Sequence, residues 1–406
     1  MKRSNFLLGT VSGLAVVASG DHVFAQALAQ SPLPGLPGSQ NRCLVLVNLN
    51  GGNDGLNCIV PHGDPQYYQM RPSLAIPASD VLAIDSTLGF NPKMQSLKTM
   101  YDKGMVAIVQ GVGYPNADHS HFRSSEIWQT GVPDRYEHTG WLGRYLDDAG
   151  LPDSNLFKGV AVSQVLPEAL VATRTDVPAI SNLGNYGLIA NREAFSREAY
   201  SQESRDRRLP FNSPYLAHVM EIEDHAQRTS EELPHLISGY KTQAAYPATP
   251  IGRSLALVAQ IIGSNLGTKV LYVQHGSFDT HVSQMATQNN LLAQFSDAMS
   301  AFYTDLAAHG NDRRVLTMTF SEFGRRIEEN GARGTDHGEA SPLFLIGGGV
   351  KGGVYGKLPD FSSTNMGNLA YTTDFRSVYA TVLERWLGRP SATVLGGSFD
   401  KIPVLS

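Results

Sequence analysis

Residues 43–55 have the sequence CLVLVNLNGGNDG, and this stretch decides the fold class of the chain. Residues 43–49 are almost continuously apolar and include β-branched valines, which is typical of a strand buried on both faces. Gly51 and Gly52 then allow the backbone to turn sharply and bring Asp54 to the carboxyl end of that strand. Functional sites of α/β proteins lie at this end, although Asn, Asp and Gly are also the preferred residues of plain turns.

Four further apolar runs suit buried strands, each bounded by Gly, Asn or Asp. They are residues 105–110, 269–274, 314–320 and 342–346. Helical patterns, in which apolar residues recur every three or four positions, accompany these runs. They are residues 92–103, 251–266, 289–309 and 373–387. This alternation predicts an α/β domain over residues 42–406, with a mostly parallel central sheet covered by helices on both faces.

The bulk composition limits the partners that the chain can have. The formal net charge is -5 and only 17% of the residues are charged, so there is no basic field for nucleic acid or an acidic membrane surface. No apolar run reaches the roughly 20 residues that a bilayer-spanning helix needs. We therefore expect neither a nucleic acid partner nor a transmembrane segment.

The N-terminus has the features of an export signal. Two basic residues precede a short apolar stretch at residues 6–18, and small-residue cleavage sites follow at Ala27 and Ala29. We interpret residues 1–29 as a signal peptide for the Tat or the Sec export machinery, and the Pro/Gly-rich residues 30–41 as a linker. The mature protein is then periplasmic or secreted.

Two features leave alternatives open. Residues 192–250 are polar and charged and contain no strand-like run, which predicts a helical insertion over the sheet or a disordered segment. Cys43 and Cys58 are the only cysteines, which excludes a disulfide-rich scaffold and a four-cysteine zinc site. They are either bonded to each other or buried as two thiols.

Acidic residues, histidines and arginines gather in the loops that follow the predicted strands. They are Ser120, His121 and Arg123 after the second strand, Asp279 and His281 after the third, Glu322 and Arg325 after the fourth, and Asp336 and His337 in the next segment. Each loop taken alone also suits a polar turn or a helix cap. Because a parallel sheet would bring all of these loops to one edge, we expect them to share a site.

The residue types in these loops suit metal binding and nucleophilic chemistry. Residues two apart in an extended segment point the same way, so Asp279 and His281 could hold one ion from one side. A neighbouring base could activate the hydroxyl of Ser120. Glu322 could bind a metal and Arg325 an anionic substrate group. The chain lacks a Gly-x-Ser-x-Gly motif, which argues against an ordinary α/β-hydrolase.

Five motifs, in this order along the chain, resemble the family named domain of unknown function 1501, which is itself similar to the alkaline phosphatase and sulfatase superfamily. The motifs are residues 51–56, 120–122 with 128–131, 278–281, 321–325 and 334–338. The resemblance implies an alkaline-phosphatase-like fold and a divalent metal, which would be zinc, calcium, magnesium or manganese. The ligand candidates that it implies are Asp54, Asp279, His281, Glu322, Asp336 and His337.

The sequence departs from the superfamily pattern at two positions. Counting back from Thr130 by the sulfatase spacing reaches His121 where the nucleophile is expected, with Ser120 one place earlier. Phe323 stands where the superfamily has a histidine ligand. The resemblance therefore implies a site with one metal or none.

Three hypotheses for the function follow. The first is an exported metal-dependent hydrolase of phosphate or sulfate esters, in which Ser120 or a metal-bound water attacks and Arg123 or Arg325 neutralises a small anionic substrate. The second is a non-catalytic exported binding or assembly protein that keeps the fold, which Phe323 favours. The third is a metal-free esterase that uses Ser120 with a histidine.

Overall fold

The structure is a computed structural model, and it describes residues 9–11, 14–16, 41–152, 154–181, 225, 228, 229, 232–362 and 364–405. Most of the predicted insertion, signal peptide and linker therefore lies outside the described residues. In that N-terminal part, β1 (Gly9–Val11) and β2 (Leu14–Val16) form a small antiparallel sheet of their own. Among the described helices, none combines the length and the apolar character that crossing a bilayer requires.

An eight-stranded sheet forms the centre of the molecule. The strand order is β12-β7-β11-β10-β3-β9-β8, and β15 pairs with the end of β7. The strands are β3 (Cys43–Leu49), β7 (Val106–Gly113), β8 (Gly159–Val162), β9 (Val270–His275), β10 (Val315–Phe320), β11 (Ser341–Gly347), β12 (Gly353–Tyr355) and β15 (Thr373–Asp374). Strand β8 went unpredicted because four residues are too few to show a periodic pattern.

All strand pairings in this sheet are parallel except those of β11. Strand β3 pairs in parallel with β10 and β9, whereas β11 runs antiparallel to both β10 and β7. The prediction of a mostly parallel sheet is confirmed, but β11, predicted at residues 342–346, was wrongly placed among the parallel strands. The chain leaves β10 and returns into β11 from the same edge, so it never makes the crossover that a parallel pair needs.

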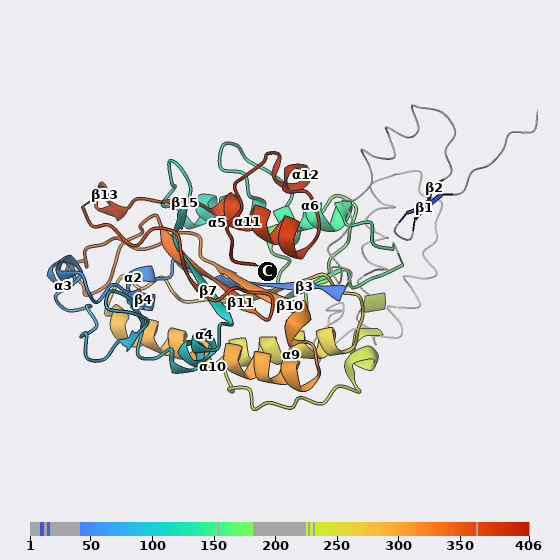
Figure 1. Cartoon of the computed structure of the whole chain (residues 1–406), viewed down its shortest axis with the longest axis horizontal. Coiled ribbons are helices and arrows are strands. Elements are labelled where there is room, and N and C mark those ends of the chain that lie inside the picture. Colours follow the sequence, from blue (N-terminus) through green and yellow to red (C-terminus); the bar gives the residue numbers. More distant parts are fainter. Residues whose placement is uncertain are drawn as a thin grey trace, which may run out of the picture.

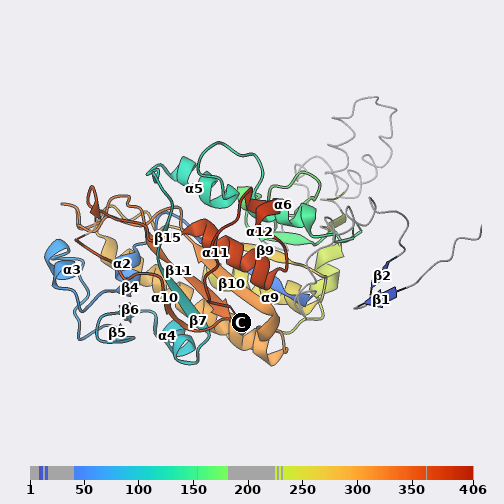
Figure 2. The ribbon, with the colours of Figure 1, turned by 45° about the horizontal axis from the view of Figure 1, so that its top comes forward.

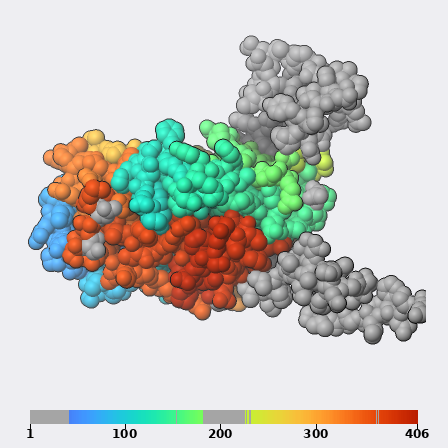
Figure 3. Space-filling view, turned by 90° about the horizontal axis from the view of Figure 1, so that it is seen from above, coloured from blue at the N-terminus to red at the C-terminus, as the bar shows by residue number. Residues whose placement is uncertain are grey.

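Helices cover both faces of the sheet, as Figure 1 shows. One face carries α4 (Gln95–Asp102), α9 (Pro250–Gly263) and α10 (Gln284–Ala308). The other carries α5 (His121–Thr130), α6 (Trp141–Asp148), α11 (Phe375–Thr381), the π-helix η5 (Val382–Trp386) and α12 (Ser391–Leu395). The segments of α6 and α12 lie side by side on that second face (Figures 2 and 3).

Alternation along β3 explains the two cores. Val45 and Val47 pack on the side of α9 and α10, whereas Leu44 and Leu46 pack on the side of α5 and α11. Aromatic side chains fill the second core, where Trp141 stacks on Tyr379 with 4.3 Å between ring centroids. Because both sides of the strand are covered, its apolar run shows no polar alternation.

Short elements connect these layers. They are α2 (Gly55–Cys58), β4 (Ile59–Val60), α3 (Pro65–Met70), β5 (Leu82–Ala83), β6 (Gly89–Phe90), η2 (Glu168–Leu170), η4 (Asp312–Arg314), β13 (Thr364–Asn365) and β14 (Asn368–Leu369).

Both cysteines, Cys43 and Cys58, are buried as free thiols, so the disulfide alternative is wrong. Burial raises the pKa of each thiol to about 12.

Candidate metal centre

The loops that follow β7, β9 and β10 meet at the carboxyl edge of the sheet. His121 is the first residue of α5, Asp279 and His281 follow β9, and His337 lies between β10 and β11. Because β7, β9 and β10 all run in the same direction, their carboxyl ends share one edge. Four of the predicted residues are thus brought together, with Asp336 beside them.

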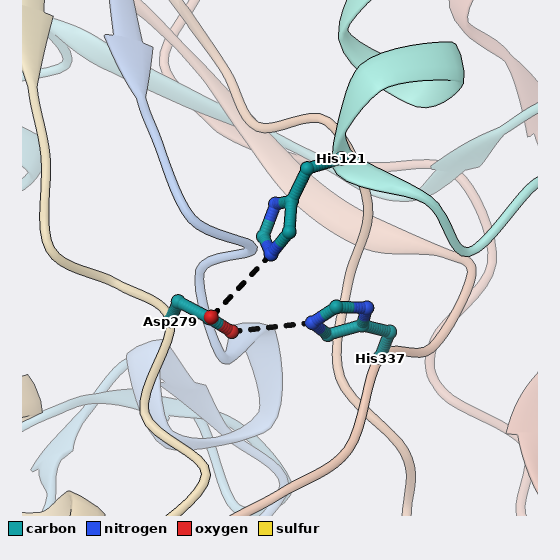
Figure 4. A group of neighbouring side chains, drawn as sticks. All are labelled: His121, Asp279 and His337. Atoms are coloured by element: carbon teal, nitrogen blue, oxygen red, sulfur yellow. Dashed lines mark hydrogen bonds and ion pairs between the residues drawn. The ribbon is translucent and has the colours of Figure 1, made fainter.

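Asp279 lies at the middle of this cluster, as Figure 4 shows. Its Oδ2 is 3.4 Å from Nε2 of His121, and its Oδ1 is 3.2 Å from Nε2 of His337. Ligand atoms of these three residues all lie within 4.8 Å of one another. His281 is a fourth neighbour, since its Nε2 lies 2.9 Å from Asp279 Oδ1 and 3.0 Å from His337 Nε2.

The other ring nitrogen of each histidine faces an oxygen atom. These Nδ1 contacts join His121 to Glu322 (2.9 Å), His337 to the main-chain carbonyl of His119 (2.7 Å) and His281 to Asp336 (3.3 Å). Carbonyl and carboxylate oxygens only accept, so they favour the tautomer with hydrogen on Nδ1 and a lone pair on Nε2. Metal-binding histidines are held in this way.

The cluster therefore gathers several electron-rich atoms, and Arg325 is bonded to the carboxylate of Asp279. Three imidazole lone pairs and a carboxylate repel one another at these distances unless a proton or a cation lies among them. Histidine nitrogen and carboxylate oxygen are ligands for zinc and similar divalent ions. The donor set fits a divalent metal on chemical grounds.

Electrostatics keep the donors in the forms that bind a metal. Partial burial alone would raise the pKa of Asp279, but the hydrogen bond and the positive charge of Arg325 oppose it, and the pKa lies at about 2. Burial lowers the pKa of His337, so its ring is neutral at neutral pH. A hydrogen bond from Asn330 lowers the pKa of Asp336. Carboxylate and imidazole are thus both ready to donate electron pairs.

Glu322 is buried beside the cluster and contacts His121. Its side chain is 1% exposed, and its Oε1 accepts hydrogen bonds from the main-chain N–H of Gly51 (2.8 Å) and from Nδ1 of His121 (2.9 Å). It was predicted as a metal ligand, yet the structure shows it orienting the imidazole of His121. The carboxylate also ties the end of β10 to the glycine turn after β3.

Arg325 holds Asp279 rather than facing the open side of the site. The guanidinium is buried and donates to the carbonyls of Gly52 (2.7 Å) and Thr335 (2.7 Å) and to Asp279 Oδ1 (2.7 Å). It also contacts the carbonyls of Gly51 and Phe278. The predicted role of neutralising a substrate anion does not agree with this burial, because its donors are already engaged.

Asp54 is not part of the group formed by His121, Asp279 and His337. Its carboxylate is 1% exposed, and Oδ2 accepts a hydrogen bond from Arg71 at 2.6 Å and another from Gln284. Its Oδ1 has no hydrogen-bond partner among the described residues. After Gly51 and Gly52, both with positive φ, the chain enters α2 and carries Asp54 inward. The prediction that Asp54 is a ligand in the common site does not fit this placement.

Ser120 and Arg123 flank His121 but differ in exposure and contacts. Ser120 is exposed at the N-cap of α5, and its hydroxyl makes no capping hydrogen bond. Arg123 pairs with Glu126 at 2.5 Å and donates to the carbonyl of Pro133 at 2.9 Å. Its guanidinium also lies over the ring of Tyr136. Ser120 therefore stays available beside the cluster, whereas Arg123 secures the loop after α5.

Phe323 packs against two of the imidazoles, which also contact each other. Its ring centroid is 4.3 Å from that of His337 and 4.9 Å from that of His121. A methyl group added at Gly52 would lie 2.4 Å from the Phe323 ring, so the glycine is required for this packing. The aromatic ring thus fills the position where the resemblance implies another histidine ligand, and the described cluster suits one metal rather than two.

Several residues of the site were missing from the sequence-based prediction. His119 supplies the carbonyl that holds His337, Asn330 binds Asp336, and Arg71 neutralises Asp54. His119 lies in the same loop as His121, so its proximity could have been inferred. Nothing in the sequence indicates Arg71 or Asn330, because each meets its partner through a fold-dependent contact.

The fold and the side chains together define an α/β protein with a histidine and carboxylate centre at the carboxyl edge of its sheet. A family model described as "Protein of unknown function (DUF1501)" matches residues 41–390. The chain belongs to this family, which confirms the resemblance seen in its motifs. No curated protein matches the sequence.

Solved structures with a similar fold come from several bacteria. A sulfatase from Pseudoalteromonas sp. is 13% identical, with a TM-score of 0.40, over 95% of this chain and 75% of that chain. A phosphonate monoester hydrolase of Agrobacterium radiobacter is 10% identical, with a TM-score of 0.39, over 88% and 78%. A protein in the alkaline phosphatase superfamily from Vibrio parahaemolyticus is 10% identical, with a TM-score of 0.38, over 87% and 69%. Likenesses this weak say nothing about the reaction of this chain.

Proposed function

We propose that this chain is an exported metal-dependent hydrolase of phosphate or sulfate esters. The observation that supports it is the convergence of three imidazole Nε2 atoms on Asp279, while their Nδ1 atoms face oxygen acceptors. His121, Asp279 and His337 would hold the metal, with His281 as a further donor. Nitrogen-rich donors favour zinc over manganese, calcium and magnesium, which prefer oxygen ligands.

A divalent ion at this place supplies positive charge that polarises an ester oxygen and lowers the pKa of a bound water. Hydrolysis breaks the bond between phosphorus or sulfur and the leaving oxygen, adds the OH of water and returns a proton to the alcohol. Ser120 is exposed next to His121 and is the side-chain nucleophile in this proposal. Glu322 orients His121, and Arg325 holds Asp279 in place.

The contacts of Arg123 and Arg325 limit how the proposed substrate can be bound. Arg123 or Arg325 was expected to neutralise the substrate, but Arg123 binds Glu126 and Arg325 is buried against carbonyls. The charge of a bound ester is therefore met at the histidine cluster itself. Substrate affinity should depend on the metal more than on either arginine.

Export is the part of the proposal that the N-terminal sequence supports. Two basic residues, the apolar residues 6–18 and the sites at Ala27 and Ala29 form a signal peptide pattern. Cleavage after Ala27 or Ala29 should give the mature N-terminus of protein isolated from its native host. An intact Met1 or Lys2 terminus, detected by mass spectrometry in the cytosol, would contradict export.

A non-catalytic metal-binding protein is the second candidate. It is favoured by Phe323, whose ring fills a ligand position, and by the engagement of Arg123 and Arg325 in contacts of their own. Such a protein would keep the metal centre for binding or assembly. It would bind metal stoichiometrically without turning over esters.

Two measurements separate the hypotheses. Elemental analysis gives the metal content of the purified mature protein, and a panel of aryl phosphates and aryl sulfates is assayed with zinc, manganese, magnesium or calcium. Metal with turnover supports the hydrolase, and metal without turnover supports the binding protein. Turnover without metal that is lost in Ser120→Ala supports the esterase. Loss of turnover in Ser120→Ala with metal retained identifies a serine nucleophile, whereas a small loss identifies water.

A further inference from the structure

A cavity lies at the carboxyl ends of β8 and β9, beside the loop that leads to Asp279. It encloses about 850 Å³, which is within the range of small-molecule sites. Its lining includes the last residue of β8, residues 163–165 that follow it, Gln274 of β9, Gly276 and part of α9. Figure 2 shows β9 and α9, two of the elements around it. Ligands of α/β proteins bind at this edge of the sheet.

One side of α9 forms a wall of this cavity. The residues that it contributes recur at helical spacing and therefore share a face, and they are Pro250, Arg253, Ser254, Leu257 and Gln260. Arg253 is exposed, and Ser254 and Gln260 are partly exposed. The side-chain polar atoms of Ser254 and Gln260 are not among the buried atoms that lack a partner, so a ligand in the cavity can reach them.

Gln274 is an exposed residue in a buried strand. The other five residues of β9 are buried, as expected for a strand that is covered on both faces. A Cβ atom added to Gly276 would lie 3.9 Å from Nε2 of Gln274, and both residues line the cavity. The cover of the sheet is therefore open at this point, and the amide of Gln274 is accessible to a ligand.

The lining combines neutral polar groups with one cation. Three amides and three hydroxyls belong to it, and they come from Gln164, Gln260, Gln274, Ser163, Ser181 and Ser254. Arg253 is the one charged residue among the described residues of the lining. Its Nη1 donates to the carbonyl of Ala248 at 3.1 Å, and it forms no ion pair within the described part of the chain. The positive charge of Arg253 is therefore left for a ligand.

This composition distinguishes between classes of ligand. The described lining contains no Asp, Glu, His or Cys, so it does not suit a metal ion. An entirely apolar ligand would deprive the amides and hydroxyls of hydrogen-bond partners. An amide side chain offers a donor and an acceptor side by side, and a sugar hydroxyl both donates and accepts, so the two match. A carboxylate on the sugar would pair with Arg253.

We propose that this cavity is a binding site for an acidic oligosaccharide, a chain of sugars that carry carboxylates. Arg253 pairs with a carboxylate, Gln260 and Gln274 bind hydroxyls, and Leu257 packs against the carbon face of a sugar ring. No histidine of the candidate metal centre lines the cavity. The site therefore does not depend on the proposed hydrolase activity.

Calorimetric titration of the purified full chain tests this site. The probe is trigalacturonate, and the control ligand is its methyl ester, which keeps the hydroxyls but has no charge. The protein is first stripped of metal with EDTA, because carboxylates are themselves metal ligands and would otherwise bind at the metal centre. Trigalacturonate should bind saturably at a stoichiometry of one, and the methyl ester should bind at least about tenfold more weakly.

Variants of the cavity make the result specific. Arg253→Gln and Gln274→Leu should each weaken binding of trigalacturonate by about tenfold or more. The matched controls are Arg313→Gln in η4 and Gln95→Leu on α4, both at exposed positions, and they should leave the affinity unchanged. Circular dichroism checks that each variant is folded. The proposal is overturned if trigalacturonate does not bind, if the methyl ester binds equally well, if both cavity variants bind like the wild-type protein, or if the controls weaken binding as much.

Discussion

Asp54 and Asp279 both follow a strand at the carboxyl edge of the sheet, and both were predicted as metal ligands, yet their surroundings are opposite. Asp54 is 1% exposed and paired at 2.6 Å with the buried guanidinium of Arg71. Asp279 is 43% exposed and has three imidazoles around it. Arginine keeps its charge at any working pH, so the charge of Asp54 is compensated permanently inside the fold.

The contrast shows what decides the role of a carboxylate at a sheet edge. Arg325 holds one oxygen of Asp279, but the histidines around that residue present ring nitrogens that an ion can share. The pair of Asp54 and Arg71 is closed to solvent, and Oδ1 of Asp54 has no hydrogen-bond partner among the described residues. A residue type and its position at a strand end are therefore insufficient. Each carboxylate contacts a buried arginine, and only Asp279 is exposed and has imidazoles around it.

The largest expected effect comes from Asp279→Ala. Losing the central carboxylate should reduce metal affinity by about a hundredfold or more and remove any ester hydrolysis with it, while the fold remains intact. Metal content and turnover are measured on the same preparation, and circular dichroism checks the fold. His281→Ala should reduce both quantities together. Asp102→Asn, at an exposed position on α4, is the matched control. A metal content equal to the wild type in Asp279→Ala would exclude the centre described above.

Asp54→Asn should act on stability instead. The change leaves the Arg71 guanidinium buried without its counter-ion, so the free energy of unfolding should fall by about 3–5 kcal/mol. Urea denaturation followed by fluorescence measures this loss, and metal titration of the folded fraction should give the wild-type affinity. Loss of metal with unchanged stability would place Asp54 among the ligands after all.

Glu322→Gln tests whether the contact between Glu322 and His121 contributes to metal affinity. The amide can still accept from the N–H of Gly51, but a neutral oxygen holds His121 less firmly. Metal affinity should fall by about 10–100-fold, with little change in stability. Competition with a chelator of known affinity gives the value, and Glu328→Gln, at an exposed position, is the control. An unchanged affinity would show that the contact between Glu322 and His121 is incidental.

The smallest expected effect concerns the reactivity of the two buried thiols. Because burial raises the pKa of Cys43 and Cys58 to about 12, almost no thiolate exists at pH 8. The folded protein should therefore resist a thiol reagent at that pH, and both thiols should react after unfolding. Mass spectrometry counts the labels. Labelling of the folded protein at a rate similar to that of the unfolded protein, or a recovered disulfide, would contradict this burial.

The sequence predicted the parts of the fold that depend on local pattern. Apolar runs located β3, β7, β9, β10 and β11 to within a few residues, because buried strands need continuous apolar side chains. The direction of β11 was missed, since periodicity contains no information about whether the chain crosses over or returns. The family was predicted from the order of the motifs, and the matching family model confirms it.

The candidate site was predictable in residue type and less so in role. Strand-end position was enough to bring His121, Asp279, His281 and His337 together. The same argument brought Arg325 to Asp279 but did not predict its role, and it did not predict the pairing of Asp54 with Arg71, because both depend on packing between distant segments. Burial was the missing quantity, and it depends on how the layers close around each loop.

The antiparallel strand β11 has a consequence for how this family can diversify. The 20 residues between Phe320 and Ser341 leave the sheet and return to it at the same edge. They carry Glu322, Phe323 and His337, so one continuous segment supplies much of the metal centre. The segment is held together by pairing of its two ends, as between Arg325 and His337. A change within it would therefore affect several residues of the candidate metal centre at once.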